Sequence, residues 1–166
     1  IISLTEEYCA HNYHPEEVVV SEACGARVRN PEGREFYDML SAYSAPNFGH
    51  RHPEIVAAAK EQLGKVTLTS RAFHNELLGE FCKRLAELTG PEAVLPMNTG
   101  AEAVETALKT ARRYGSFVKG VPDGKQHIIC CAGTFDGRTT TIVSMSADPT
   151  ARKAAAASTA GFTPRP

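Results

Sequence analysis

The feature that most constrains this fold is the way hydrophobic residues change their spacing between residues 53 and 132. In some stretches they recur every three or four residues, as on one face of a helix, and in others they form short continuous runs, as in a strand buried on both faces. This alternation, with short connections, indicates an α/β layered fold with a parallel sheet. The predicted elements are a helix over 53–63, a helix over 75–88, a strand end over 93–97, a helix over 101–114 closed by Gly115, and a strand over 127–132.

Two further stretches flank this alternation. Short apolar and β-branched runs between Val18 and Tyr37, separated by turn residues, predict a small β-meander. After Ser146, small and polar residues replace large apolar ones, which predicts a loop or a disordered end. We therefore divide the chain into an N-terminal segment with the meander (1–50), the first part of a large domain (51–146) and a tail (147–166).

Composition excludes several classes of protein. Eighteen basic and 19 acidic residues among 166 give a net charge of −1, which argues against nucleic acid or an anionic membrane as the main partner. No apolar run approaches the roughly 20 residues that span a bilayer. Five cysteines without a CxxC pair favour a reducing compartment. The chain opens at Ile1 and not at Met, so we expect a processed, excerpted or truncated product.

The first candidate site lies where the strand end over 93–97 leads into a helix through Asn98-Thr99-Gly100-Ala101. The first-turn amides of such a helix point outward, and Gly100 would let an anion approach closely. A phosphate site is one interpretation. An ordinary helix N-cap is the alternative, because Asn and Thr cap helices often and the segment is neither a Walker loop nor GxGxxG.

The second candidate site lies just beyond the strand over 127–132, where α/β sheets usually bind ligands. Phe135 could stack on a flat ring, and Arg138 could bind a carboxylate through its guanidinium fork. Core packing for Phe135 and a surface ion pair for Arg138 are the alternatives. A third group, the HxH pair His50 and His52, is a weak metal candidate, because Glu54 is the only close carboxylate. We expect no metal.

These stretches, in this order, resemble the ornithine aminotransferases, a branch of the class-III aminotransferases that use pyridoxal 5'-phosphate. The resemblance extends from about Tyr8 to about Ser146. It is carried by HNYHP over 11–15, DMLSAYSA over 38–45, GHRHP over 49–53, LTSRAF over 68–73, LPMNTGA over 95–101 and FDGRT over 135–139. Asp136 and Phe48 depart from the usual pattern of the family, but neither carries a predicted role.

The resemblance implies the N-terminal part of fold type I of the pyridoxal-phosphate-dependent transferases, with αβα layers and a mainly parallel sheet. Gly100 and Ala101 would bind the cofactor phosphate, and Phe135 would stack on its ring. Tyr13 and Arg138 would hold the α-carboxylate of the substrate, and Tyr43 would shape the pocket. The implied reaction transfers the δ-amino group of ornithine to 2-oxoglutarate in a homodimer. The implied location is intracellular, either the bacterial cytoplasm or the mitochondrial matrix.

The resemblance assigns no catalytic residue to this chain. The family's cofactor-binding lysine and the acid that pairs with the pyridine nitrogen lie far downstream, and none of the lysines here stands in the family's lysine motif. We therefore expect this chain alone to be inactive. The related acetylornithine and 4-aminobutyrate aminotransferases are the alternative activities. A non-catalytic fragment that keeps only the fold and dimer contacts is an alternative of another class, and a zinc hydrolase using His50 and His52 is a third.

Overall fold

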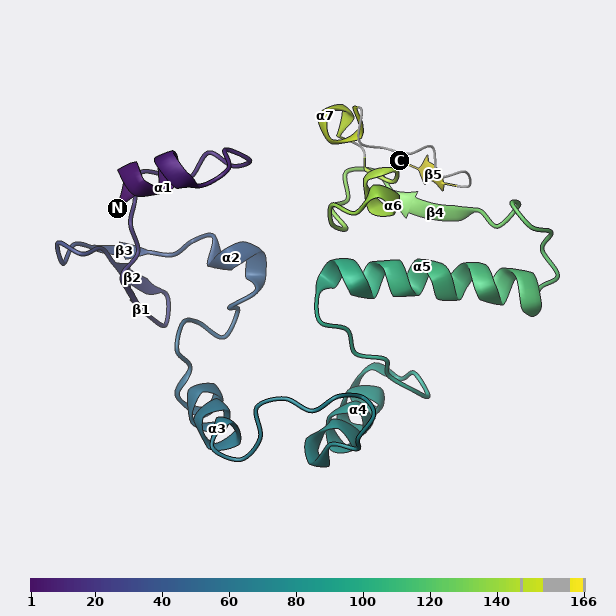
Figure 1. Ribbon diagram of the computed structural model, residues 1–166, viewed down its shortest axis with the longest axis horizontal. Coiled ribbons are helices and arrows are strands. Elements are labelled where there is room, and N and C mark those ends of the chain that lie inside the picture. The colour runs from purple at the N-terminus through teal and green to yellow at the C-terminus, as the bar shows by residue number, and fades with distance from the viewer. Residues whose placement is uncertain (147, 154–161, 166) are drawn as a thin grey trace. The chain divides into compact units, whose positions relative to one another are not determined.

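The computed structural model describes residues 1–146, 148–153 and 162–165 of this chain (Figure 1). These residues fall into two units, Ile1–Asn75 and Glu76–Pro166. The functional division predicted from composition, with boundaries after residues 50 and 146, stays a prediction.

The first unit is built around the predicted β-meander. Its elements are α1 (Ile2–Tyr8), β1 (Glu22–Cys24), β2 (Arg27–Arg29), β3 (Glu35–Tyr37), α2 (Ser41–Ser44) and α3 (Pro53–Leu63). The three strands pair antiparallel in the order β1-β2-β3. The turn between β2 and β3 closes because the amide of Gly33 donates to the carbonyl of Asn30 at 3.0 Å and Gly33 takes a φ of 85°, which a glycine adopts without strain. This confirms the predicted turn.

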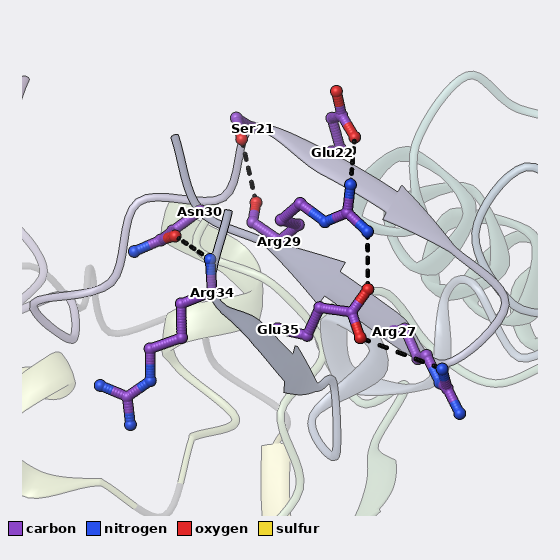
Figure 2. A network of polar contacts seen from close by, with 7 residues as sticks. All are labelled: Ser21, Glu22, Arg27, Arg29, Asn30, Arg34 and Glu35. Carbon is purple, nitrogen blue, oxygen red and sulfur yellow. Dashed lines mark hydrogen bonds and ion pairs between the residues drawn. The ribbon is translucent and has the colours of Figure 1, made fainter. Parts of the chain in front are cut away.

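The two faces of the meander differ in chemistry. Val28 on β2 is buried and stands opposite Ala23 on β1 and Phe36 on β3. The other face carries ion pairs that cross the strands: Arg29 lies 3.7 Å from Glu22 and 2.7 Å from Glu35 (Figure 2). Because successive side chains of a strand point to opposite faces, this alternation gives the small sheet one apolar and one charged side.

The second unit contains the longest helices. Its elements are α4 (Glu76–Thr89), α5 (Gly100–Phe117), β4 (Ile128–Cys131), α6 (Thr140–Val143), α7 (Pro149–Arg152) and β5 (Phe162–Arg165). β4 and β5 pair in parallel, so the predicted parallel pairing is present, but the partner of β4 is β5 in the tail and not the run over 93–97. A small core forms where α5 meets α6: Leu108, Ile142 and Met145 are buried, and Ala101 and Ile128 are among the residues packed against them.

Three details differ from the sequence-based expectation. The run over 93–97 is not a strand, because no strand among the described residues pairs with it and an unpaired segment forms no ladder. α5 continues through Gly115 to Phe117, because a glycine inside a helix costs only about 1 kcal/mol. β4 is not buried on both faces, since Ile129 is 73% exposed.

The tail also carries more structure than its composition predicts. Asp148 caps α7 by accepting a hydrogen bond from the amide of Thr150 at 2.8 Å, and Pro149 stands at the first helical position, where its missing N–H is not needed. β5 lies in the same tail. The remainder of the predicted loop, residues 147, 154–161 and 166, lies outside the described residues.

Candidate functional site

The N-terminus of α5 forms a complete capping box. The Thr99 hydroxyl accepts from the amide of Glu102 at 3.1 Å, and the Glu102 carboxylate accepts from the amides of Asn98 and Thr99 at 2.9 and 3.1 Å. Thr99 is therefore the N-cap of α5. It leaves the amides of Gly100 and Ala101 as the donors of the first turn that have no partner among the described residues.

The turn after β4 packs directly on this helix end. A Cβ atom built on Gly137 would lie 3.1 Å from the Cβ of Ala101 and 3.2 Å from the Cδ1 of Ile142, so a larger residue there would push these neighbours back by a few tenths of an ångström. Its φ of 126° is also rare for other residues. The turn after β4 and the start of α5, which are far apart in the sequence, therefore meet at Gly137 and Ala101.

A polar contact reinforces this packing. The Thr139 hydroxyl donates to the Glu105 carboxylate on α5 and accepts from the amide of Ile142 at 3.2 Å, which caps α6. Because Thr139 follows Arg138 directly, this bond fixes the turn that carries Phe135 and Arg138 against α5. The structure therefore brings together four of the residues predicted to form the site, Gly100, Ala101, Phe135 and Arg138.

Phe135 and Arg138 contact one another. The guanidinium carbon of Arg138 stands 5.5 Å from the centre of the Phe135 ring, within the range of a cation–π contact. The Phe135 side chain is 74% exposed, so it is not a core residue as the alternative interpretation had it. The ring and the guanidinium belong to the same turn, whose Gly137 packs on Ala101 at the start of α5.

The two tyrosines singled out from the sequence lie in the first unit. Tyr13 and Tyr43 are both exposed. Tyr43 belongs to α2, which is a left-handed turn: Ser41, Ala42, Tyr43 and Ser44 have φ values of 52°, 44°, 57° and 72°. Residues with a Cβ atom are disfavoured in this conformation by roughly 1–2 kcal/mol each. Sequence reasoning missed this turn, because none of these residue types signals a positive φ.

Asp38 holds the start of the left-handed turn. Its Oδ1 accepts from the amides of Leu40 and Ser41 at 3.1 and 2.8 Å, and its Oδ2 lies 2.7 Å from the Nε2 of His50. These contacts, the one with His50 first, hold the pKa of the Asp38 carboxyl below its ordinary value. An ionised carboxylate only accepts hydrogen bonds, so the Nε2 of His50 carries the proton. Sequence reasoning missed Asp38 as a site residue, and the nearby HxH pair was the only signal.

The histidines do not form a metal centre in the part of the chain that the structure describes. No group of three or more His, Cys, Asp or Glu side chains gathers among those residues. His50 pairs with Asp38, and His52 packs its ring edge-on to Phe48 with centroids 6.4 Å apart. All five cysteines are free thiols. Among the described residues, no helix combines the length and the apolar character that crossing a bilayer requires.

The class of this protein follows from its α/β fold, from the capped helix with two open amides and from the turn that carries Phe135 and Arg138. Residues 8–165 match the family Aminotransferase class-III, and the chain belongs to this family. The predicted fold, the N-terminal part of fold type I of the pyridoxal-phosphate-dependent transferases, is confirmed by its structural neighbours.

The particular relatives are ornithine and acetylornithine aminotransferases. The chain is 60% identical to the ornithine aminotransferase of Bacillus subtilis (strain 168) over 89% of its own length and 37% of that relative. A Toxoplasma gondii ornithine aminotransferase, whose structure shows partial occupancy of PLP at the active site, is 40% identical with a TM-score of 0.94 over 99% of this chain and 38% of that one. The Elizabethkingia anophelis acetylornithine aminotransferase is 50% identical with a TM-score of 0.82 over 99% of this chain and 39% of that one. The chain thus spans less than half the length of these relatives.

Proposed function

We propose that this chain is the N-terminal part of an ornithine δ-aminotransferase that uses pyridoxal 5'-phosphate. The observation that supports the proposal is the packing of Gly137 on Ala101, because the turn of Gly137 also carries Phe135 and Arg138, whose guanidinium lies 5.5 Å from the Phe135 ring. The similarity to ornithine aminotransferases supports the substrate. The reaction would move the δ-amino group of ornithine to 2-oxoglutarate and yield glutamate 5-semialdehyde and glutamate.

The residues of the second unit fit the cofactor. The amides of Gly100 and Ala101 would donate to its phosphate, and the positive end of the α5 dipole would favour the negative charge. Phe135 would stack on the pyridine ring. When bound, the cofactor supplies the electron sink of transamination. The lysine that binds it covalently is not assigned to any position of this chain.

The substrate would be held through its α-carboxylate. Arg138 would donate two parallel hydrogen bonds to it, and the hydroxyl of Tyr13 would add a third. Binding at this end leaves the δ-amino group of ornithine at the reacting end. Tyr43 would shape the substrate pocket. These three roles, with those of Gly100, Ala101 and Phe135, are carried over from the matching motifs.

Acetylornithine aminotransferase is the second candidate activity, because a solved acetylornithine aminotransferase is 50% identical to this chain. 4-Aminobutyrate is a further candidate substrate. Steady-state assays of the full-length enzyme with each amine donor and 2-oxoglutarate decide among them. We expect the highest kcat/KM with ornithine. A higher kcat/KM with N-acetylornithine or 4-aminobutyrate would contradict the assignment.

We also propose that the full-length enzyme is a homodimer with composite active sites. Large apolar side chains between residues 39 and 73 are exposed, with Met39 at 92%, Leu68 at 88% and Phe73 at 71%. A second copy would cover such side chains. Sedimentation velocity of the full-length enzyme is expected to give a dimer, and a fully active monomer would refute the proposal.

A further inference from the structure

The segment that carries Tyr43 is tied at both ends to the β-meander. At its start, the amide of Asp38 donates to the carbonyl of Ala26 at 2.9 Å. At its end, His50 pairs with Gly25 through two backbone hydrogen bonds of 2.8 and 2.9 Å. The turn between β1 and β2, formed by Gly25 and Ala26, therefore holds the two ends of this segment close together.

The side chains of the two end residues then meet. The Nε2 of His50 lies 2.7 Å from the Oδ2 of Asp38, and the side chains are only 30% and 19% exposed. Gly49 allows the end of the segment to lie against Gly25, since a Cβ atom at position 49 would lie 3.0 Å from the Cα of Gly25. We call Asp38 and His50 the loop clasp.

The loop clasp also contacts the left-handed turn. The second carboxylate oxygen of Asp38 accepts from the amides of Leu40 and Ser41, and the carbonyl of Leu40 accepts from the amide of Tyr43 at 3.0 Å. A continuous chain of hydrogen bonds thus runs from the His50 ring to the backbone of Tyr43. Ala42 and Tyr43 have φ and ψ values near 50°, which residues with a Cβ atom adopt only when their surroundings impose it.

We propose that Asp38 and His50 are positioning residues for substrate selection, and that they act by holding Tyr43 in the left-handed turn. This inference rests on the proposed role of Tyr43 in the ornithine pocket. Neither member of the loop clasp touches the substrate. Without the clasp, the turn would relax toward right-handed conformations, and the Tyr43 side chain would leave the pocket wall.

A double-mutant cycle in the full-length holoenzyme tests this. His50→Ala is expected to lower kcat/KM for ornithine by about tenfold, whereas the same change in a Tyr43→Ala background is expected to alter it by less than about twofold. His50→Gln, whose amide can still donate to Asp38, should keep most of the activity. Glu35→Gln removes an ion pair from the meander without touching the clasp, and serves as the matched control. The absorbance of the bound cofactor should be unchanged in all variants.

Amide hydrogen exchange of residues 39–47, read by mass spectrometry, gives a second measurement that needs no turnover. It should be faster in His50→Ala than in the wild type and in Glu35→Gln. If His50→Ala fails to fold, Asp38→Asn takes its place in the cycle. Equal losses in both Tyr43 backgrounds, or unchanged exchange, would overturn the inference and leave the proposed function intact. A wild-type enzyme that does not use ornithine would contradict the proposed function itself.

Discussion

The proposed chemical roles of single residues in the candidate site are separable, because the proposed cofactor contacts and substrate contacts come from different residues. The amides of Gly100 and Ala101 and the ring of Phe135 would serve the cofactor. Tyr13 and Arg138 would serve the substrate carboxylate. A substitution at one residue should therefore change one binding event and not the other.

We predict that Tyr13→Phe in the full-length enzyme weakens the use of ornithine without changing the absorbance of the bound cofactor. Losing a hydrogen bond to a charged group should cost about 1.5–3 kcal/mol of transition-state stabilisation, and kcat/KM should fall accordingly. Steady-state kinetics measure this. Tyr37→Phe is a matched control, because Tyr37 is an exposed tyrosine of the same unit. An unchanged kcat/KM for ornithine in Tyr13→Phe would remove Tyr13 from the substrate site.

We predict that Phe135→Ala loosens pyridoxal 5'-phosphate, because stacking worth roughly 0.5–1.5 kcal/mol is lost. The rate of cofactor loss during dialysis should rise about twofold to tenfold. Ala101→Val should have the same direction of effect, by crowding the phosphate and the turn at Gly137. Phe117→Ala is the control, since Phe117 is also exposed and lies 4.7 Å from the guanidinium of Arg113. If both site variants retain the cofactor like the control, the phosphate binds elsewhere.

At the scale of elements, hydrophobic periodicity predicted the helices and strands whose formation depends on local sequence. The helix over 75–88 appears as α4, and the strand over 127–132 appears as β4. The predicted meander is present, but its first strand is Glu22–Cys24 and not the apolar run over 18–20. The junction at Gly100 and the turn at Phe135 were predicted as separate candidates. That Gly137 joins them could not be predicted from either segment, because the contact depends on how α5 and α6 pack.

The left-handed turn shows why other elements escape prediction. Its conformation is imposed by hydrogen bonds to Asp38 and by pairing of His50 with Gly25, and residue propensities carry no trace of either. The prediction of a strand over 93–97 was wrong for a related reason. A strand needs a partner, and a local pattern cannot say whether one is present.

The loop clasp should make this element sensitive to acid. The pKa of Asp38 is lowered in the folded state, so its contribution to stability is complete above the unfolded pKa and is lost as pH falls through the folded pKa. We predict that the Cγ resonance of labelled Asp38 in the full-length enzyme titrates below the ordinary value of 3.8, and at higher pH in His50→Ala, which removes the hydrogen bond. Lys65→Gln, which frees a different carboxylate, Glu61, should leave the midpoint unchanged. An Asp38 titration midpoint that is the same in the wild type and in the His50 variant would contradict the role of the loop clasp.

At the scale of the whole molecule, large apolar side chains are exposed on several elements. Leu88 is 82% exposed on α4, Phe117 is 76% exposed on α5, and Ile129 is 73% exposed on β4. Such side chains, together with strand edges, favour association. The buried core of the second unit is correspondingly small.

We predict that residues 1–166 expressed alone do not transaminate and bind a hydrophobic dye strongly. The assay is δ-transamination with ornithine and 2-oxoglutarate, with 1-anilinonaphthalene-8-sulfonate fluorescence as the second readout. The full-length enzyme is the control for both. Turnover by the short chain that one Lys→Ala change abolishes would reveal a catalytic lysine within it and overturn this prediction.

The close approach of Gly137 to Ala101 has a consequence for how such a sequence can change over time. A larger residue at position 101 approaches the turn, and a side chain at position 137 approaches the helix, so added volume at either position requires its neighbours to shift. The two positions lie in different motifs, yet they share one small space. Their histories should be linked: substitutions at one should appear only alongside compensating changes at the other or in the neighbouring Ile142.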